Sequence, residues 1–226
     1  MIEVFEKYRI GLAVAFLLGI TACSGGSSDG AAGPSAGQDV CGGFGPWQSS
    51  PFTLPYTIGE SSRVNQGNCS GFGHSGFWQY GYDFEMPIGT VVTAARDGEV
   101  VHAQDGATDG DRTRTNLITV EHADGSIALY SHLTLNGVHV TAGQQVLAGD
   151  SIGLSCNTGN TGGLPHLHFS LHPCQSLPGL PGTDSCPSMP VNFRNTDANP
   201  EGLISNRTYK ALSFQVGVQT FAFSVF

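Results

Sequence analysis

The stretch GGLPHLHFSLH, residues 162–172, contains three histidines whose spacing could bring them to one face of a β-strand. His166, His168 and His172 are even numbers of residues apart, and side chains on a strand alternate between its two faces. The other face would be apolar, with Leu167, Phe169 and Leu171. Imidazole nitrogens bind metal ions and exchange protons near neutral pH, so the histidine face is a candidate metal or acid–base site.

Short strands joined by tight turns are predicted around this site. Segments 91–95 and 99–103 flank an Arg-Asp-Gly turn, and segments 117–122 and 127–133 flank an Ala-Asp-Gly turn. Asp-Gly between alternating apolar runs favours a β-hairpin, because glycine adopts the positive φ that such turns require. With 32 Gly, 12 Pro and only short apolar runs, the chain is expected to be all-β, forming a compact antiparallel sheet or sandwich.

The charge balance excludes one class of partner. The chain has nine Lys and Arg against 18 Asp and Glu, which gives a net charge of −9. A surface of this sign repels phosphate backbones, so no nucleic-acid partner is expected.

The N-terminus has the pattern of an export signal. Lys7 and Arg9 precede the apolar run IGLAVAFLLGITA, which is too short for a comfortable membrane span and is followed by Cys23. Residues 20–23, Ile-Thr-Ala-Cys, resemble the lipobox of bacterial lipoproteins; this implies cleavage of a signal peptide at 1–22, a lipid on Cys23 and, with Ser24 next, sorting to the outer membrane. A plain cleaved signal is the alternative. The Gly-, Ser- and Ala-rich residues 23–38 are predicted to form a flexible tether.

Export would place the remaining cysteines in an oxidising compartment, where disulfides persist. These are Cys41, Cys69, Cys156, Cys174 and Cys186, an odd number that allows at most two bridges. We expect Cys41 to pair with Cys69, and Cys174 to pair with either Cys186 or Cys156. The sequence has no Cys-x-x-Cys spacing, so neither a cysteine zinc knuckle nor a thioredoxin-like role is supported.

Several motifs in a fixed order resemble peptidase family M23, the lysostaphin and LytM type of zinc endopeptidase. They are an Asp before a Pro-x-Gly-Thr strand in DFEMPIGT, a Tyr-x-His-Leu in YSHL, and the loop and strand NTGNTGGLPHLHF. The resemblance implies a peptidase domain of the LytM (duplicated hybrid motif) type at residues 71–173. Residues 39–70 would then be an N-terminal extension, and residues 174–226 a C-terminal β extension.

The resemblance also assigns roles to individual residues. Asp83 and His168 fall on two zinc-ligand positions, and His132 and His166 fall on the two catalytic histidines of the family. These residue types suit the chemistry, because a catalytic zinc takes three nitrogen or oxygen ligands and keeps one position for water. An imidazole beside that water can accept its proton or stabilise the developing oxyanion.

The third ligand departs from the family pattern. The pattern His-x-x-x-Asp would place a histidine at position 79, where this chain has Gln79, a neutral residue and a poor zinc ligand. Either His74 serves as the third ligand from a longer loop, or the metal site is degenerate. A straight strand would turn His74 and Asp83 to opposite faces, so recruitment needs a bulge or loop, which the glycines between them allow. We favour His74.

The sequence therefore predicts a zinc-dependent metalloendopeptidase that hydrolyses peptide cross-links of peptidoglycan, with Zn²⁺ held by His74, Asp83 and His168. The expected location is the cell envelope, as an outer-membrane lipoprotein that faces the periplasm or is exported. A regulatory protein partner is left open. The alternative is a catalytically degenerate LytM-type domain that binds or activates cell-wall amidases. A biotinyl or lipoyl carrier is disfavoured, because the turn at 147–149 lacks a lysine.

Overall fold

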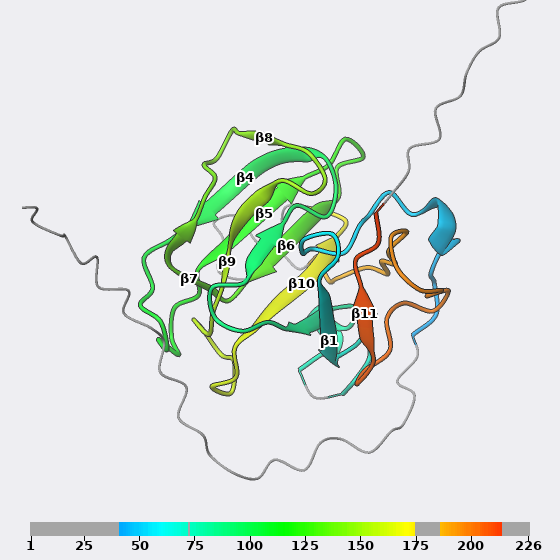
Figure 1. Ribbon diagram of the computed structural model, residues 1–226, viewed down its shortest axis with the longest axis horizontal. Coiled ribbons are helices and arrows are strands. Elements are labelled where there is room, and N and C mark those ends of the chain that lie inside the picture. Colours follow the sequence, from blue (N-terminus) through cyan, green and yellow to red (C-terminus); the bar gives the residue numbers. More distant parts are fainter. Residues whose placement is uncertain (1–40, 72, 175–185, 214–226) are drawn as a thin grey trace, which may run out of the picture.

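The computed structural model describes residues 41–71, 73–174 and 186–213 (Figure 1). The predicted signal peptide and tether, with Cys23, lie outside the described residues, as do residues 214–226. Among the described helices, none has the length and apolar character needed to cross a membrane.

Two antiparallel β-sheets make up the described part of the chain, which confirms the all-β prediction. The eight-stranded sheet has the spatial order β11 (Thr208–Lys210), β1 (Ser61–Gln66), β2 (Tyr82–Glu85), β10 (His166–His172), β6 (Ile127–Ser131), β5 (Leu117–Glu121), β4 (Gly98–Gln104) and β8 (Gln145–Val146). The three-stranded sheet has the order β3 (Val91–Thr93), β9 (Ser151–Ser155) and β7 (Leu133–Val138). Two short 3₁₀ helices, η1 (Trp47–Ser49) and η2 (Gly76–Trp78), lie in the loops.

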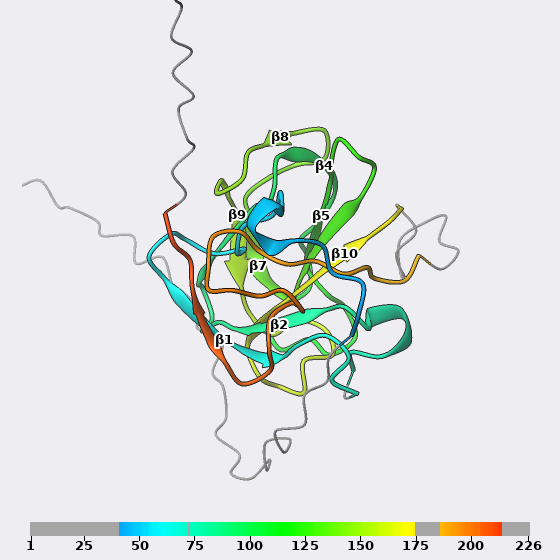
Figure 2. The ribbon, with the colours of Figure 1, turned by 90° about the vertical axis from the view of Figure 1, so that its right-hand side faces the viewer.

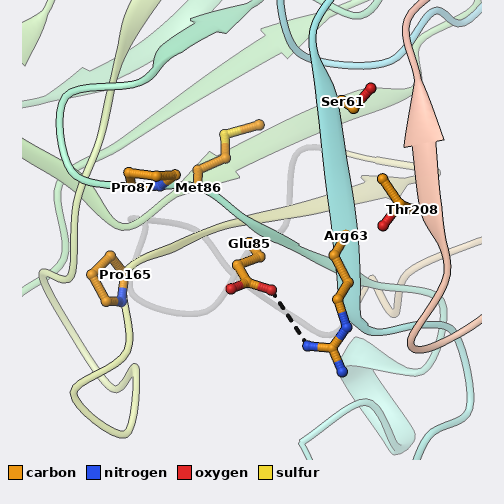
Figure 3. A pocket seen from close by; sticks show the side chains of 7 residues that line it. All are labelled: Ser61, Arg63, Glu85, Met86, Pro87, Pro165 and Thr208. Atoms are coloured by element: carbon orange, nitrogen blue, oxygen red, sulfur yellow. Dashed lines mark hydrogen bonds and ion pairs between the residues drawn. The ribbon is translucent and has the colours of Figure 1, made fainter. Parts of the chain in front are cut away.

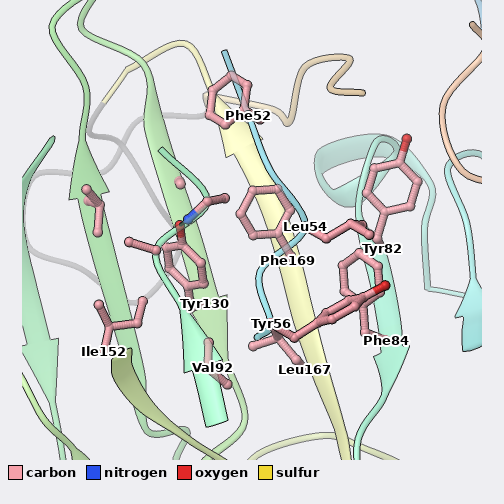
Figure 4. Close-up of a cluster of buried hydrophobic side chains, with 14 of the residues drawn as sticks. Phe52, Leu54, Tyr56, Tyr82, Phe84, Val92, Tyr130, Ile152, Leu167 and Phe169 are labelled. Atoms are coloured by element: carbon pink, nitrogen blue, oxygen red, sulfur yellow. Dashed lines mark hydrogen bonds between the residues drawn. The ribbon is translucent and has the colours of Figure 1, made fainter. Parts of the chain in front are cut away.

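One hydrophobic core joins the two sheets (Figure 4). Val92 of β3 and Ile152 of β9 enter it from the smaller sheet, while Tyr130 of β6 and Phe169 of β10 enter it from the larger one. Removing these side chains from water is the main force that holds the sheets together. The strands that carry the candidate site therefore rest on a rigid base.

Strand β10 lies at the centre of the large sheet, between β2 and β6. Its predicted alternation is confirmed, because Leu167, Phe169 and Leu171 all belong to the core. The opposite, histidine-bearing face is buried as well, since every residue of β10 is buried. Ser170 and His172 of that face are fully buried, whereas His166 and His168 keep exposed fractions of 7% and 9%.

Only one of the two predicted hairpins forms. Strands β5 and β6 pair as expected across the Ala-Asp-Gly turn. The prediction for segments 91–95 and 99–103 was wrong, because β3 pairs with β9 in the small sheet while β4 pairs with β5 and β8 in the large one. The Arg-Asp-Gly turn thus carries the chain from one sheet to the other.

The segments on either side of residues 71–173 pack into the same structure. Strand β1 pairs with β2, and β11 pairs with β1 at the edge of the large sheet (Figure 2). Phe193 and Leu203, from the described C-terminal part, are buried in the core. This part therefore adds an edge strand and core side chains to the sheet.

Two disulfides fix these flanking segments. Cys41 pairs with Cys69, as predicted, and Cys174 pairs with Cys186. The second pairing selects one of the two alternatives that the sequence left open. Cys156 is buried and takes part in neither bridge.

Candidate metal centre

The pairing of β2 with β10 sets the base of the candidate site. Asp83 lies directly opposite His168 in this register, and both side chains are buried. Asp83 Oδ1 lies 2.8 Å from His168 Nδ1. Two predicted ligands that are 85 residues apart in the chain are thus brought together by a single strand pairing.

His74 reaches the same point from a loop. The loop between β1 and β2 contains Gly73 and Gly76, both at positive φ, and these turns bring the imidazole back over the sheet. His74 Nε2 lies 3.2 Å from Asp83 Oδ1, and the ring is buried. One ligand atom from each of His74, Asp83 and His168 can be chosen so that all three lie within 4.8 Å of one another.

Gln79 points away from this centre. Its side-chain amide donates to Cys41 Sγ at 3.2 Å, and its carbonyl oxygen accepts the Cys69 N–H at 2.6 Å. Gln79 therefore contacts the Cys41–Cys69 disulfide, whereas the ring of His74 faces Asp83. The assignment of His74 as a ligand stays a prediction.

The hydrogen bonds around His74 fit a bound cation. Its Nδ1 lies 2.9 Å from the carbonyl oxygen of Gly67, which can only accept, so Nδ1 carries the hydrogen. In the neutral ring, Nε2 then presents a lone pair toward the Asp83 carboxylate. Two facing acceptors need a positive charge between them, supplied by a proton or by a metal ion. Metal-binding histidines commonly donate their other N–H to a backbone carbonyl in this way.

His168 faces Asp83 through Nδ1, and its other ring nitrogen, Nε2, is on the side of Gly81. His168 Nε2 is buried and has no hydrogen-bond partner among the described residues. The donor set, two imidazoles and one carboxylate, is one that Zn²⁺ takes in catalytic sites.

The charges at the centre are strongly coupled. Burial by itself would raise the pKa of the Asp83 carboxyl, but hydrogen bonds from His168 and His74 outweigh it and hold that pKa well below its ordinary value. Burial would lower the pKa of His74, yet its hydrogen bond to Asp83 raises the pKa overall. For His168 burial prevails, and its pKa is lowered. Asp83 is therefore ionised, and its negative charge stabilises a positive charge on a neighbouring group.

The two predicted catalytic histidines lie beside this centre. The ring centroids of His132 and His166 are 4.7 Å apart, and His166 Nε2 lies 3.7 Å from Asp83 Oδ1. His132 adopts a φ of 72°, an uncommon conformation for a residue other than glycine, at the junction of β6 and β7. Such strain persists where the surrounding structure fixes it, which is frequent at functional sites.

Backbone carbonyls fix the tautomers of both rings. His132 Nδ1 donates to the carbonyl oxygen of Thr158 at 2.6 Å, and His166 Nδ1 donates to that of Leu164 at 2.9 Å. In the neutral form each Nε2 is then a proton acceptor. Burial, and next the neighbouring His166, lowers the pKa of His132 to about 3, so this ring is neutral at physiological pH.

Aromatic side chains that the sequence analysis did not single out cover the histidine face. The indole of Trp78 packs edge-on against His168, with ring centroids 5.2 Å apart, and Phe77 stacks on His172 at 5.2 Å. Both aromatics come from η2, in the loop that also carries His74. In the sequence, the signal that Phe77 and Trp78 cover the histidine face is their closeness to the candidate ligand His74.

His172 lies outside the centre, although it shares the face. Its Nε2 lies 2.8 Å from Ser170 Oγ, and its Nδ1 donates to the carbonyl oxygen of Cys186 at 2.8 Å. The ring is completely buried. It therefore fastens the C-terminal segment to the sheet, and it is not available to a ligand.

Comparison with known proteins identifies the family. The sequence model of peptidase family M23 matches residues 78–178, a range that includes Asp83, His132, His166 and His168 and begins after His74. An uncharacterized metalloprotease of Buchnera aphidicola is 36% identical over 121 residues, which are 54% of this chain and 30% of that protein. The peptidoglycan DD-endopeptidase ShyA of Vibrio cholerae is 41% identical over 91 residues, which are 40% of this chain and 19% of that protein.

A solved structure gives a further match. The catalytic domain of lysostaphin from Staphylococcus simulans is 31% identical, with 50% of this chain and 78% of that chain covered and a TM-score of 0.36. The chain contains a domain of peptidase family M23 at residues 78–178, and the described part of the chain is all-β. It spans only 19% to 30% of the length of the two curated relatives described above.

Proposed function

We propose that this protein is a zinc-dependent endopeptidase that hydrolyses peptide cross-links of peptidoglycan. The observation that carries the proposal is the convergence of His74, Asp83 and His168 on one point, with ligand atoms within 4.8 Å of one another. The rings of His132 and His166 stand beside that point. Three ligands can hold a catalytic metal ion, and two neighbouring imidazoles can serve as acid–base groups in peptide hydrolysis.

In this proposal His74, Asp83 and His168 hold the metal. Zinc in such a site acidifies a bound water and polarises a carbonyl group. Gly67 keeps Nδ1 of His74 protonated through its carbonyl oxygen, so that Nε2 is available to bind. The anionic state of Asp83 supplies the negative charge that a divalent cation needs.

His132 and His166 handle the proton and the developing negative charge. Because its pKa is lowered, His132 is neutral, and its Nε2 can accept the proton of the attacking water. Once it carries that proton, the imidazole can donate a hydrogen bond to the oxyanion formed from the peptide carbonyl. The proton is then passed to the leaving amine when the C–N bond breaks.

The substrate and the location rest on the relatives. A relative with 41% identity over 91 residues is a peptidoglycan DD-endopeptidase, which supports a peptidoglycan peptide as substrate and the cell envelope as the place of action. We further propose that the chain is anchored by a lipid on Cys23 and held by the tether at 23–38. Mass spectrometry of the membrane fraction would detect this lipid, and an unmodified, soluble mature chain would exclude it.

The test is zinc content combined with cleavage of purified cross-linked muropeptides. Wild-type protein should bind one zinc ion and cleave the cross-link. His74→Ala and His168→Ala should lose both properties, while Gln79→Ala, the matched control, should keep the zinc. Retention of zinc by His74→Ala together with its loss in Gln79→Ala would reverse the ligand assignment. A wild-type protein that neither binds zinc nor cleaves would favour the degenerate, amidase-regulating alternative.

A further inference from the structure

A pocket is lined by residues of β1, β2 and β11 and by residues that directly adjoin β2 and β10 (Figure 3). It has a volume of about 410 Å³. Arg63 of β1 and Glu85 of β2 supply its charged wall. Its apolar wall consists of Met86, Pro87 and Pro165.

The strand register makes this pocket an extension of the centre. Asp83 and Glu85 are two residues apart on β2, so their side chains share a face and lie about 7 Å apart. Glu85 is paired across the strands with His166, and Pro165 directly precedes that histidine. A peptide whose scissile bond lies at His132 and His166 would place its adjacent residue in the pocket.

Arg63 is held in position at the pocket by three acceptors. Its Nη1 lies 3.3 Å from Glu85 Oε2 and 2.9 Å from Asn65 Oδ1, and its Nη2 contacts Asn206 Oδ1. Asn206 has a φ of 66°, so the turn before β11 adopts an uncommon conformation that brings this amide to the guanidinium. A guanidinium has five N–H donors, and these contacts leave two that no described residue accepts.

The exposure and charge of the pair suit a ligand. The Arg63 and Glu85 side chains are 45% and 53% exposed, and an ion pair in solvent is weak. A carboxylate entering the pocket can therefore take the remaining guanidinium donors without disrupting a strong contact. Two parallel N–H bonds to a carboxylate are a favoured arrangement for arginine.

We propose that this pocket is a substrate subsite that binds a carboxylate on the residue next to the scissile bond, with Arg63 as the specificity-determining residue. The hydrocarbon part of that residue packs on Pro87 and Pro165, the accessible apolar residues of the pocket. This inference rests on the proposed peptidase function. Arg63, Asn65 and Asn206 all lie outside the residues 78–178 that match the M23 family model.

The experiment compares two cross-linked peptides that differ by one carboxylate. The residue whose side-chain amine enters the scissile bond is diaminopimelate in one peptide and lysine in the other. Wild-type protein should show a kcat/KM about 10- to 100-fold higher for the diaminopimelate peptide, the range of a charge-assisted hydrogen bond. Arg63→Gln should reduce this ratio to near one. Lys210→Gln, which removes the same charge from the neighbouring edge strand outside the pocket, should keep the wild-type ratio.

Binding of the same two peptides to metal-free protein, measured by calorimetry, separates this inference from the proposed function. If zinc-loaded protein cleaves neither peptide, the function fails, but an Arg63-dependent preference of tenfold or more in Kd would still support the subsite. Equal kcat/KM or equal Kd for the two peptides with wild type would overturn it. A preference that survives in Arg63→Gln, or that is lost equally in Lys210→Gln, would also overturn it.

Discussion

The Cys41–Cys69 disulfide is expected to position a metal ligand as well as to stabilise the fold. It joins the two segments that hold the His74 loop in place, because Gln79 contacts both cysteines: its carbonyl oxygen accepts from the Cys69 N–H, and its amide donates to Cys41 Sγ. The perturbation is the double replacement Cys41→Ser and Cys69→Ser. The double replacement Cys174→Ser and Cys186→Ser is the matched control.

The two bridges differ little in their expected effect on stability. They link residues 28 and 12 positions apart. Loop-closure entropy then gives about 3.5 kcal/mol for the first and about 2.8 kcal/mol for the second. If stability were the only effect, the two double variants would behave almost alike.

Zinc affinity should distinguish the two double variants. Groups that orient a metal ligand from behind typically contribute 10- to 100-fold to affinity. Loss of the Cys41–Cys69 bridge frees the loop that aims His74, so zinc affinity should fall by about this factor. Loss of the Cys174–Cys186 bridge leaves β2, β10 and the His74 loop in place, so zinc affinity should stay within about threefold of wild type.

The assay is a zinc competition titration against a chromophoric chelator, performed below the unfolding transition of each variant. Urea unfolding of the metal-free proteins supplies the stability change separately. Equal zinc affinity for the two double variants, at comparable stability losses, would refute the positioning role. A loss of affinity confined to Cys174→Ser and Cys186→Ser would show that the C-terminal bridge, and not the loop bridge, controls the site.

Three further predictions concern single residues. Gly81→Ala would place a methyl group 2.8 Å from Cε1 of His168, so zinc affinity should fall at least tenfold. As a control, the Gly106→Ala variant should bind zinc as wild type does, because a methyl group at position 106 meets open space. Burial lowers the pKa of His172 to about 4, from an unfolded value near 6.5. Up to about 3 kcal/mol of the stability present at pH 7 should therefore be lost as the pH falls from about 6.5 to 4. If the free energy of unfolding in urea falls equally for wild type and His172→Gln over this range, the prediction is wrong. Tyr130→Phe removes the hydroxyl that accepts the buried N–H of Ala95 at 2.8 Å. The free energy of unfolding in urea should therefore fall by about 1–3 kcal/mol, while cross-link cleavage at 25 °C should be unchanged. A drop in kcat would indicate that this tyrosine reaches the cleft.

The sequence by itself determined the local patterns. The alternation of β10 was readable because the two faces of a strand follow from spacing alone, and Leu167, Phe169 and Leu171 are in the core as expected. The hairpin at 117–133 was readable because its strands are neighbours in the chain. The odd cysteine count limited the bridges to two, and the Cys41–Cys69 pairing follows the prediction.

The tertiary structure decided every pairing between distant segments. Strand β3 leaves its neighbour β4 and pairs with β9, because the turn between β3 and β4 crosses from one sheet to the other. Gln79 faces a disulfide while His74 faces Asp83, which depends on how the loop folds back over the sheet. Arg63 gains its place beside the centre only through β1 and the Asn206 turn. Such arrangements depend on which apolar faces bury one another across the whole chain, and no short window of sequence contains that information.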